Sequence, residues 1–355
     1  MNLAGTPLLI TGLTAVVLTA LLIAVTWERG GRLRVVLRTV GVIAALLSVT
    51  VTVLVQLNRM TEAYVDPEAD SVASGTESDE SEPDAAEPEL SEPDSASTTS
   101  TASARSTIRA FKVKGKASGL TLSMYVYLPA AYGTGNQRFP VVQAAHGYPG
   151  SPRTWLKKLE VQSVLDAEIA AGRMAPTVVL FPFQTPRQLL DTECTNMRGG
   201  PQTETFLTVD VPAFAKAHLR VRTDRAGWGL IGYSAGGYCA TSLALRNPTK
   251  YAAAASMSGL AGPGIVVGDG KEHTEHNVAW RLQHMPRPAM ALWIGWAKDE
   301  EKIRRDSLLI ARAARPPISL TTAEVERGGH NHAVWRQMEA PAFNWLSAQL
   351  GRPLP

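Results

Sequence analysis

The feature that most constrains the fold is an alternation of short apolar runs with longer helical stretches, which begins at residue 107. Residues 120–129 alternate apolar and polar side chains, whereas 139–147 and 175–183 are continuously apolar, as strands buried in a parallel sheet are. We expect strands at 120–129, 139–147, 175–183, 227–234, 251–259, 289–296 and 319–326, and helices at 153–171, 209–219, 235–246, 301–314 and 333–349. This alternation predicts an α/β fold, a mostly parallel sheet with helices on both faces.

The segment Gly232-Tyr233-Ser234-Ala235-Gly236 lies where a predicted strand meets a predicted helix and fits the pattern G-x-S-x-G. Its glycines permit a tight turn that leaves the serine oxygen exposed near a helix amino terminus. Small-residue turns of this kind also occur for packing reasons alone. Ligands on parallel sheets bind beyond the carboxyl ends of the strands, and this position favours Ser234 as a catalytic nucleophile.

A nucleophilic serine needs a base that is oriented by an acid, and in this fold the chain order is serine, acid, histidine. His330, in "GGHNHAVW", stands on a glycine-rich loop between the last predicted strand and the final helix, and it is the predicted base. His332 is the local alternative. "EHTEH", with His273 and His276, lacks the spacing of a metal motif and is interpreted as a solvated loop. No metal or cofactor is expected.

The acid should follow the predicted strand at 289–296, where "AKDEEK" offers three carboxylates. Asp299 is favoured because it sits in the loop just before the helix. Glu300 and Glu301 remain alternatives, although residues in the first turn of a helix also interact favourably with its dipole.

An oxyanion hole requires two backbone N–H groups directed at the developing negative charge. Ala235, which follows the nucleophile, and Tyr148, in the loop "HGYPG", are the expected donors. The neighbouring His146 is expected to stiffen this loop by hydrogen bonding.

The first hundred residues have a different character. Residues 8–27 and 39–57 are apolar runs separated by the arginine-rich "ERGGRLRVVLR", which predicts a transmembrane hairpin within 1–60, with spans at about 8–27 and 36–57. The basic loop is expected to stay cytoplasmic, so the remainder of the chain would lie on the extracytoplasmic side of the cell membrane. A cleaved signal peptide is the alternative for the first run.

Residues 61–106 are acidic and rich in serine and proline, and they are predicted to form a disordered linker because they bury too little apolar surface. Some forty residues of this kind reach roughly 35 Å. The remaining residues 107–355 form the predicted catalytic domain. Residues 106–355 carry 29 basic and 18 acidic side chains, a net charge of +11 that favours anionic surfaces, but no nucleic-acid-binding motif is found.

Cys194 and Cys239 are the only cysteines in the chain. On an oxidising side of a membrane such a pair is expected to form a disulfide. Two buried thiols are the alternative.

The predicted catalytic domain resembles the esterase D-like branch of the α/β hydrolases and, within it, the secreted actinobacterial mycolyltransferases of the antigen 85 type. The matching segments are "QTETFLTVDVPAFAKAHLRV" (202–221), "GLIGYSAGGYCATSLALRNPTKYAAAASMSGL" (229–260) and "GGHNHAVWRQMEAPAFNWL" (327–345). The resemblance implies a Ser–acid–His triad, an acyl-enzyme, and acyl transfer to water or a sugar. The segment "PGSPRTWLKK" departs from the mycolyltransferases, because it contains Arg153 but no carboxylate to hold a sugar acceptor.

The sequence therefore favours a membrane-anchored serine esterase that acts on small-molecule or lipid esters. An acyltransferase that uses the same triad with a sugar or polyol acceptor is the first alternative. A tethered protein that binds cell-wall components without turnover is the second.

Overall fold

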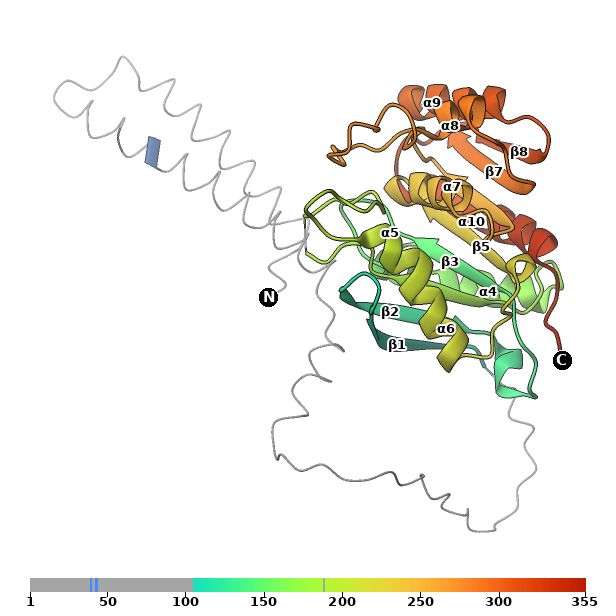
Figure 1. The fold of residues 1–355 in the computed structure, drawn as a ribbon. Coiled ribbons are helices and arrows are strands. Elements are labelled where there is room, and N and C mark those ends of the chain that lie inside the picture. The colour runs from blue at the N-terminus through green and yellow to red at the C-terminus, as the bar shows by residue number, and fades with distance from the viewer. Residues whose placement is uncertain (1–38, 40–41, 44–104, 188) are drawn as a thin grey trace, which may run out of the picture. The chain divides into compact units, whose positions relative to one another are not determined.

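The computed structural model describes residues 39, 42–43, 105–187 and 189–355 (Figure 1). None of the helices in these ranges is both long and apolar enough to cross a membrane. The predicted spans at 8–27 and 36–57 and the predicted linker at 61–106 lie outside the described residues, apart from a few positions. They therefore stay predictions.

The described part of the chain forms an eight-stranded sheet in the order β1-β2-β4-β3-β5-β6-β7-β8. β1 (Thr107–Lys114) and β2 (Thr121–Leu128) are antiparallel, and β2 is antiparallel to β4 (Val178–Pro182). All pairings from β4 onward are parallel. The other strands are β3 (Val141–Ala145), β5 (Trp228–Tyr233), β6 (Ala253–Met257), β7 (Met290–Ala297) and β8 (Ile318–Val325). The expected mostly parallel sheet is confirmed.

Helices cover both faces of this sheet. They are α4 (Val161–Ala170), α5 (Thr203–Thr205), α6 (Val211–His218), α7 (Ala235–Arg246), α8 (Val278–His284), α9 (Glu301–Ala313) and α10 (His332–Leu350). Successive residues of a strand face opposite sides, and β5 shows this clearly. A Cβ atom on Gly229 would lie 3.0 Å from Leu350 of α10, whereas one on Gly232 would meet α7. The central strand thus lies between α10 and α7.

The predicted helix at 153–171 is two helices in the structure. A short π-helix, η3 (Thr154–Lys158), precedes α4, and Glu160 between them has a left-handed φ of 56°. Trp155 of η3 is fully buried, and its ring lies 5.2 Å from that of Tyr233. The break separates η3, which buries this tryptophan beside β5, from α4, which packs against α10.

β1 and α8 are among the elements that were not expected from the sequence. β1 is an edge strand with mostly exposed or half-buried side chains, so it lacks the apolar pattern that marks the other strands. α8 is short, and its amino terminus is capped by the side chain of Asn277, which accepts a hydrogen bond from the Trp280 N–H.

A disulfide joins Cys194, in the loop after β4, to Cys239 of α7. The bond closes a loop with a sequence separation of 45 residues.

We predict that replacing both cysteines by serine lowers the free energy of unfolding by about 4 kcal/mol, because the open chain gains entropy when unfolded. Urea unfolding of the wild type with and without reductant, beside the double variant, measures the effect. A difference below about 1 kcal/mol would contradict this estimate.

Candidate active site

Ser234 occupies the turn between β5 and α7. Its backbone has φ 56° and ψ −126°, a conformation rare for a residue with a side chain. The turn is held by a hydrogen bond of 2.9 Å from the Ser234 N–H to the Met257 carbonyl at the end of β6. Such strain is found where surrounding structure fixes a functional side chain.

The glycines that flank Ser234 are required by close approach of the backbones. A Cβ atom on Gly232 would lie 2.0 Å from the Gly236 carbonyl oxygen, and one on Gly236 would lie 2.3 Å from the Ala145 carbonyl oxygen. Neither position accepts a larger residue without displacing α7 from the sheet. The motif read from the sequence therefore has a geometric cause.

A chain of hydrogen bonds runs from Ser234 to a carboxylate. Ser234 Oγ lies 2.7 Å from His330 Nε2, and His330 Nδ1 lies 2.6 Å from Glu300 Oε1. The histidine side chain is 42% exposed, whereas that of Glu300 is 3% exposed. The three side chains come from the ends of β5, β7 and β8, so they meet at one edge of the sheet.

The structure corrects the expected acid, because Glu300 and not Asp299 contacts His330. Both Asp299 oxygens instead accept backbone N–H groups, those of Gly328 and Gly329, at 3.0 Å each. Glu300 is the last residue before α9, and its side chain turns inward. Glu301 lies exposed in the first turn of α9.

Glu300 is held by several donors. Its second oxygen, Oε2, accepts hydrogen bonds from the Ser258 hydroxyl at 2.8 Å and from the Ala297 N–H at 3.1 Å. Burial alone would raise the pKa of Glu300, but the hydrogen bonds from His330, Ala297 and Ser258 bring it below its usual value. An ionised Glu300 favours the tautomer with the proton on Nδ1, which leaves Nε2 of His330 free to accept the serine proton.

Asp299 has a separate place in the site. The two N–H groups that it binds belong to the turn directly before His330, and they lower the pKa of Asp299. Because the turn carries the histidine, Asp299 fixes the backbone from which His330 reaches Ser234.

Ser258 was missed by the sequence analysis. It follows β6 directly, is fully buried, and has a φ of 53°. The only signal in the sequence is a hydroxyl at the carboxyl end of an apolar strand.

The loop after β3 lies beside the nucleophile. His146 is buried, its Nδ1 lies 2.9 Å from the Gly147 carbonyl oxygen, and the Gln184 side chain binds its backbone N–H and carbonyl. Burial lowers the pKa of His146 to about 4, which keeps the ring neutral. These contacts give His146 the stiffening role expected of it.

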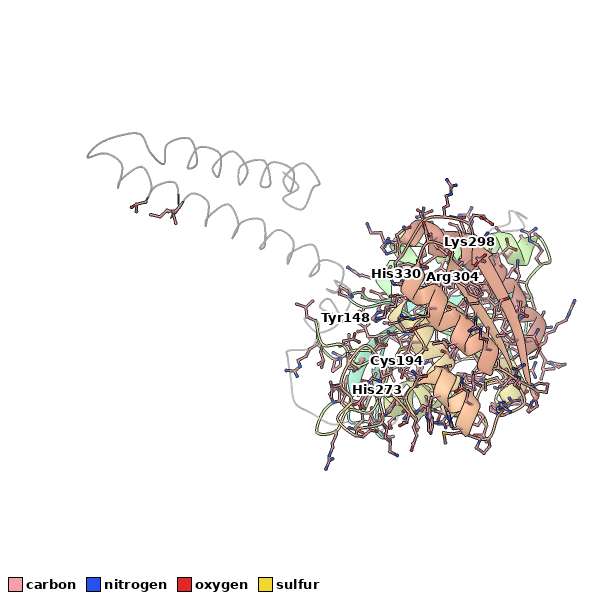
Figure 2. All side chains as sticks on the ribbon, turned by 90° about the horizontal axis from the view of Figure 1, so that it is seen from above. Tyr148, Cys194, His273, Lys298, Arg304 and His330 are labelled. Atoms are coloured by element: carbon pink, nitrogen blue, oxygen red, sulfur yellow. A yellow bond between two sulfur atoms is a disulfide. The ribbon has the colours of Figure 1, made fainter. Side chains whose placement is uncertain are left out.

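Tyr148 and His330 lie toward the same side of the domain (Figure 2). The Tyr148 hydroxyl donates a hydrogen bond of 2.9 Å to the Leu189 carbonyl, which ties the loop after β3 to the loop after β4. Ala235 begins α7. That the backbone N–H groups of Tyr148 and Ala235 bind the oxyanion stays a prediction.

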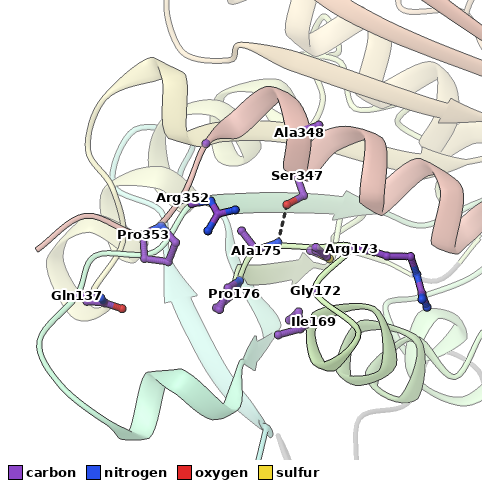
Figure 3. Close-up of a pocket in the computed structure, with 12 residues that line it drawn as sticks. Gln137, Ile169, Gly172, Arg173, Ala175, Pro176, Ser347, Ala348, Arg352 and Pro353 are labelled. Carbon is purple, nitrogen blue, oxygen red and sulfur yellow. Dashed lines mark hydrogen bonds between the residues drawn. The ribbon is translucent and has the colours of Figure 1, made fainter.

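A pocket of about 260 Å³ opens over Ser234. It is lined by Gly147, Tyr148, Pro149, Thr154, Tyr233, Ser234, His330, Asn331, His332 and Trp335. The Trp335 ring is one of the lining groups, and its centroid lies 4.5 Å from that of Tyr233 and 5.0 Å from that of His330. A larger cavity of about 580 Å³ lies at the amino ends of the strands, between the turn before β4 and the end of α10 (Figure 3). None of the Ser234, His330 and Glu300 side chains lines that larger cavity.

The other predicted histidines lie apart from this hydrogen-bonded chain. His332 lines the pocket but contacts Trp335. His273 is exposed, whereas His276 is buried, with Nε2 2.8 Å from Asp269 and Nδ1 against Arg246, so the expectation of a wholly solvated loop was wrong. No group of three metal-ligating side chains is found in the described ranges.

The chain belongs to the esterase family. Residues 116–347 match the family model described as "Putative esterase". An uncharacterized protein of Corynebacterium glutamicum is 24% identical over 245 residues, which are 64% of this chain. The alignment spans 57% of that relative's own length.

Solved structures share the fold. A ferulic acid esterase superposes with a TM-score of 0.62 at 18% identity, covering 70% of this chain and 99% of the esterase. The MPT51 (FbpC1) protein of Mycobacterium tuberculosis superposes with a TM-score of 0.55 at 14% identity, covering 69% and 99% of the two chains. The resemblance to esterases expected from the sequence is thus confirmed.

One further carboxyl group stands out on α10. Glu339 is fully buried, and both of its oxygens lack a hydrogen-bond partner in the described structure. Burial raises the pKa of Glu339 to about 9. The folded protein therefore holds a proton there that the unfolded chain releases near pH 4.5.

We predict that stability falls as the pH rises from about 5 to about 9, by at most about 1.4 kcal/mol per pH unit from this group, because the folded state binds the extra proton. Glu339→Gln should remove that slope, so that the variant is more stable than the wild type at pH 8 and similar to it at pH 5. Urea unfolding over this pH range measures the free energy of unfolding of both proteins, and Glu301→Gln, at an exposed position, is the control. Equal slopes for wild type and Glu339→Gln would contradict the assignment.

Proposed function

We propose that this protein is a serine esterase that cleaves carboxylic esters through a Ser234–His330–Glu300 triad and an acyl-enzyme. The observation that carries the proposal is the continuous hydrogen-bonded chain from Ser234 Oγ through His330 to the buried Glu300. Membership of the esterase family supports it. The fold shared with a ferulic acid esterase agrees with it.

The proposed mechanism begins with attack of Ser234 Oγ on the ester carbonyl carbon while His330 Nε2 takes the hydroxyl proton. Glu300 stabilises the imidazolium that forms. The tetrahedral oxyanion would be bound by the N–H groups of Tyr148 and Ala235. His330 then protonates the departing alkoxide, and the reverse proton transfers activate a water molecule that hydrolyses the acyl-enzyme.

The place of the reaction is also part of the proposal. The apolar runs at 8–27 and 39–57 support a membrane-anchored enzyme whose catalytic domain acts outside the cytoplasm. The disulfide between Cys194 and Cys239 agrees with an oxidising compartment.

The nucleophile is tested with a fluorophosphonate probe, which forms a bond to an activated serine. We expect wild-type protein to be labelled at Ser234 and to hydrolyse 4-nitrophenyl acetate. Ser234→Ala should lose labelling and lower kcat by several orders of magnitude. Buried Ser256→Ala, on neighbouring β6, is the matched control. Full activity in Ser234→Ala would exclude the proposed function.

A second test separates the two neighbouring carboxylates. We predict that Glu300→Gln lowers kcat by about 10³–10⁴-fold, because the amide no longer favours the productive imidazole tautomer. Asp299→Asn should cost about tenfold, since it weakens only the turn that carries His330. Steady-state kinetics of both variants decide the assignment, and a larger loss in Asp299→Asn would reverse it.

Acyl transfer to an alcohol is the second candidate, because the same acyl-enzyme can react with a sugar or polyol in place of water. The sequence segments that resemble mycolyltransferases favour it. Product analysis of the ester reaction with and without trehalose distinguishes the two. Free acid as the sole product in both would identify a hydrolase, and a sugar ester would identify a transferase.

A further inference from the structure

Basic residues stand on the two helices that border the catalytic pocket, although none of them lines the pocket itself. Thr154 of η3 and His332 of α10 both line the pocket, so these two helices border the same opening. Their neighbouring positions carry four basic side chains, Arg153, Lys157, Lys158 and Arg336. We refer to these four residues as the cationic wall.

The two helices are joined within this wall. Arg336 Nε donates a hydrogen bond of 2.7 Å to the Lys158 carbonyl, and its Nη2 lies 2.9 Å from Glu160. The Lys158 turn follows Thr154 closely, because the Leu159 N–H binds the Thr154 carbonyl at 2.9 Å. The Lys158 backbone and Arg336 are therefore held close to Thr154 and His332, which line the pocket.

Most of this positive charge is not neutralised by neighbouring side chains. Lys157 and Lys158 are exposed, and neither ammonium has an ion-pair partner in the described structure. Glu160 is the carboxylate that pairs with Arg336. Glu339, on the same helix, is uncharged at neutral pH because burial raises its pKa to about 9.

The positive potential reaches the pocket itself. The pKa of His332 is lowered, first by burial and then by the charges of Lys158 and Arg336. Tyr148 also lines the pocket, and its hydroxyl binds the carbonyl of the exposed Leu189. Asp191 is near Tyr148, but it is partly buried and accepts the Glu193 N–H at 3.0 Å.

We propose that the cationic wall is a subsite for an anionic group, a carboxylate or a phosphate, carried by the ester substrate. The inference rests on the proposed esterase function and narrows its substrate class to anionic esters. Lysine ammonium groups at an open rim attract such groups at long range and leave the scissile carbonyl free to reach Ser234. The sequence segment "PGSPRTWLKK" then supplies cations to bind a substrate anion.

The first experiment compares matched esters with the full-length chain in neutral detergent. The first pair is mono-4-nitrophenyl adipate and 4-nitrophenyl hexanoate, which differ by a carboxylate at the end of the acyl chain. The second pair is 4-acetoxybenzoate and its methyl ester, in which the carboxylate of the first compound lies on the leaving phenol. We expect the anionic member of at least one pair to have a kcat/KM about tenfold higher, and this preference should shrink as salt is raised to 0.5 M.

The variant Lys157→Gln/Lys158→Gln should lower the ratio of anionic to neutral kcat/KM about fivefold to tenfold. These side chains make no hydrogen bonds in the described structure, so folding is not at risk. Lys112→Gln, an exposed lysine of β1, is the matched control and should leave the ratio unchanged.

A second arm distinguishes a dissolved ester from a charged lipid headgroup. Fatty-acid release from phosphatidic acid is compared with release from diacylglycerol in the same neutral micelles. A preference for anions in the dissolved pairs alone identifies a soluble substrate, and a preference in micelles alone identifies a lipid.

Failure of the proposed subsite can be distinguished from failure of the proposed esterase function. Turnover of both members of every pair at ratios near one, unchanged in the double lysine variant, would overturn the subsite and leave the esterase function intact. No turnover of any ester would overturn the proposed function itself.

Discussion

The site depends on one close contact, the approach of the first turn of α7 to the ends of β3 and β5. The Cβ positions of Gly232 and Gly236 have no space, so this approach exists only with glycine at both. It forces the left-handed backbone at Ser234 and directs its hydroxyl beyond the edge of the sheet. The buried runs of β3, β5 and β6 hold the strands that make the contact rigid.

The two adjacent carboxylates after β7 show how one loop can perform two tasks. Glu300 is buried and faces the imidazole, whereas Asp299 is exposed and binds the turn that precedes His330. The two residues lie at a turn closed by a hydrogen bond of 3.2 Å from the Glu300 N–H to the Ala297 carbonyl, and only Glu300 faces the histidine. The other remains free to hold the histidine's own loop, and both contacts restrict where His330 Nε2 can lie.

Much of the fold could be predicted because parallel strands buried on both faces are continuously apolar. The positions of Ser234 and His330 followed from the same pattern, since Ser234 ends a predicted strand and His330 stands on the loop after the last one. The acid could not be predicted with the same accuracy. Its identity depends on where β7 ends and α9 begins, and a shift of one residue there exchanges Asp299 for Glu300.

Ser258 and β1 escaped prediction for different reasons. Ser258 acts through a tertiary contact with a residue 42 positions away, which no local pattern records. β1 pairs with β2 along its whole length, and Val113 is its single fully buried side chain. Contacts over long sequence distances, and edges that face solvent, leave little trace in hydrophobic periodicity.

The placement of the cationic wall depends on the break at Glu160, within the single helix that was predicted at 153–171. A continuous helix over 153–171 would place its residues on a single axis. The left-handed Glu160 instead separates η3 from α4, so that Trp155 is buried against Tyr233 while Lys157 and Lys158 of the same short helix are exposed. One buried aromatic ring thus fixes the backbone from which two exposed charges project, and the Arg336 bond to Lys158 joins that backbone to the helix that begins beside His330. Core packing therefore helps to position the backbone that carries these charges, because Trp155 packs against Tyr233, which lines the pocket.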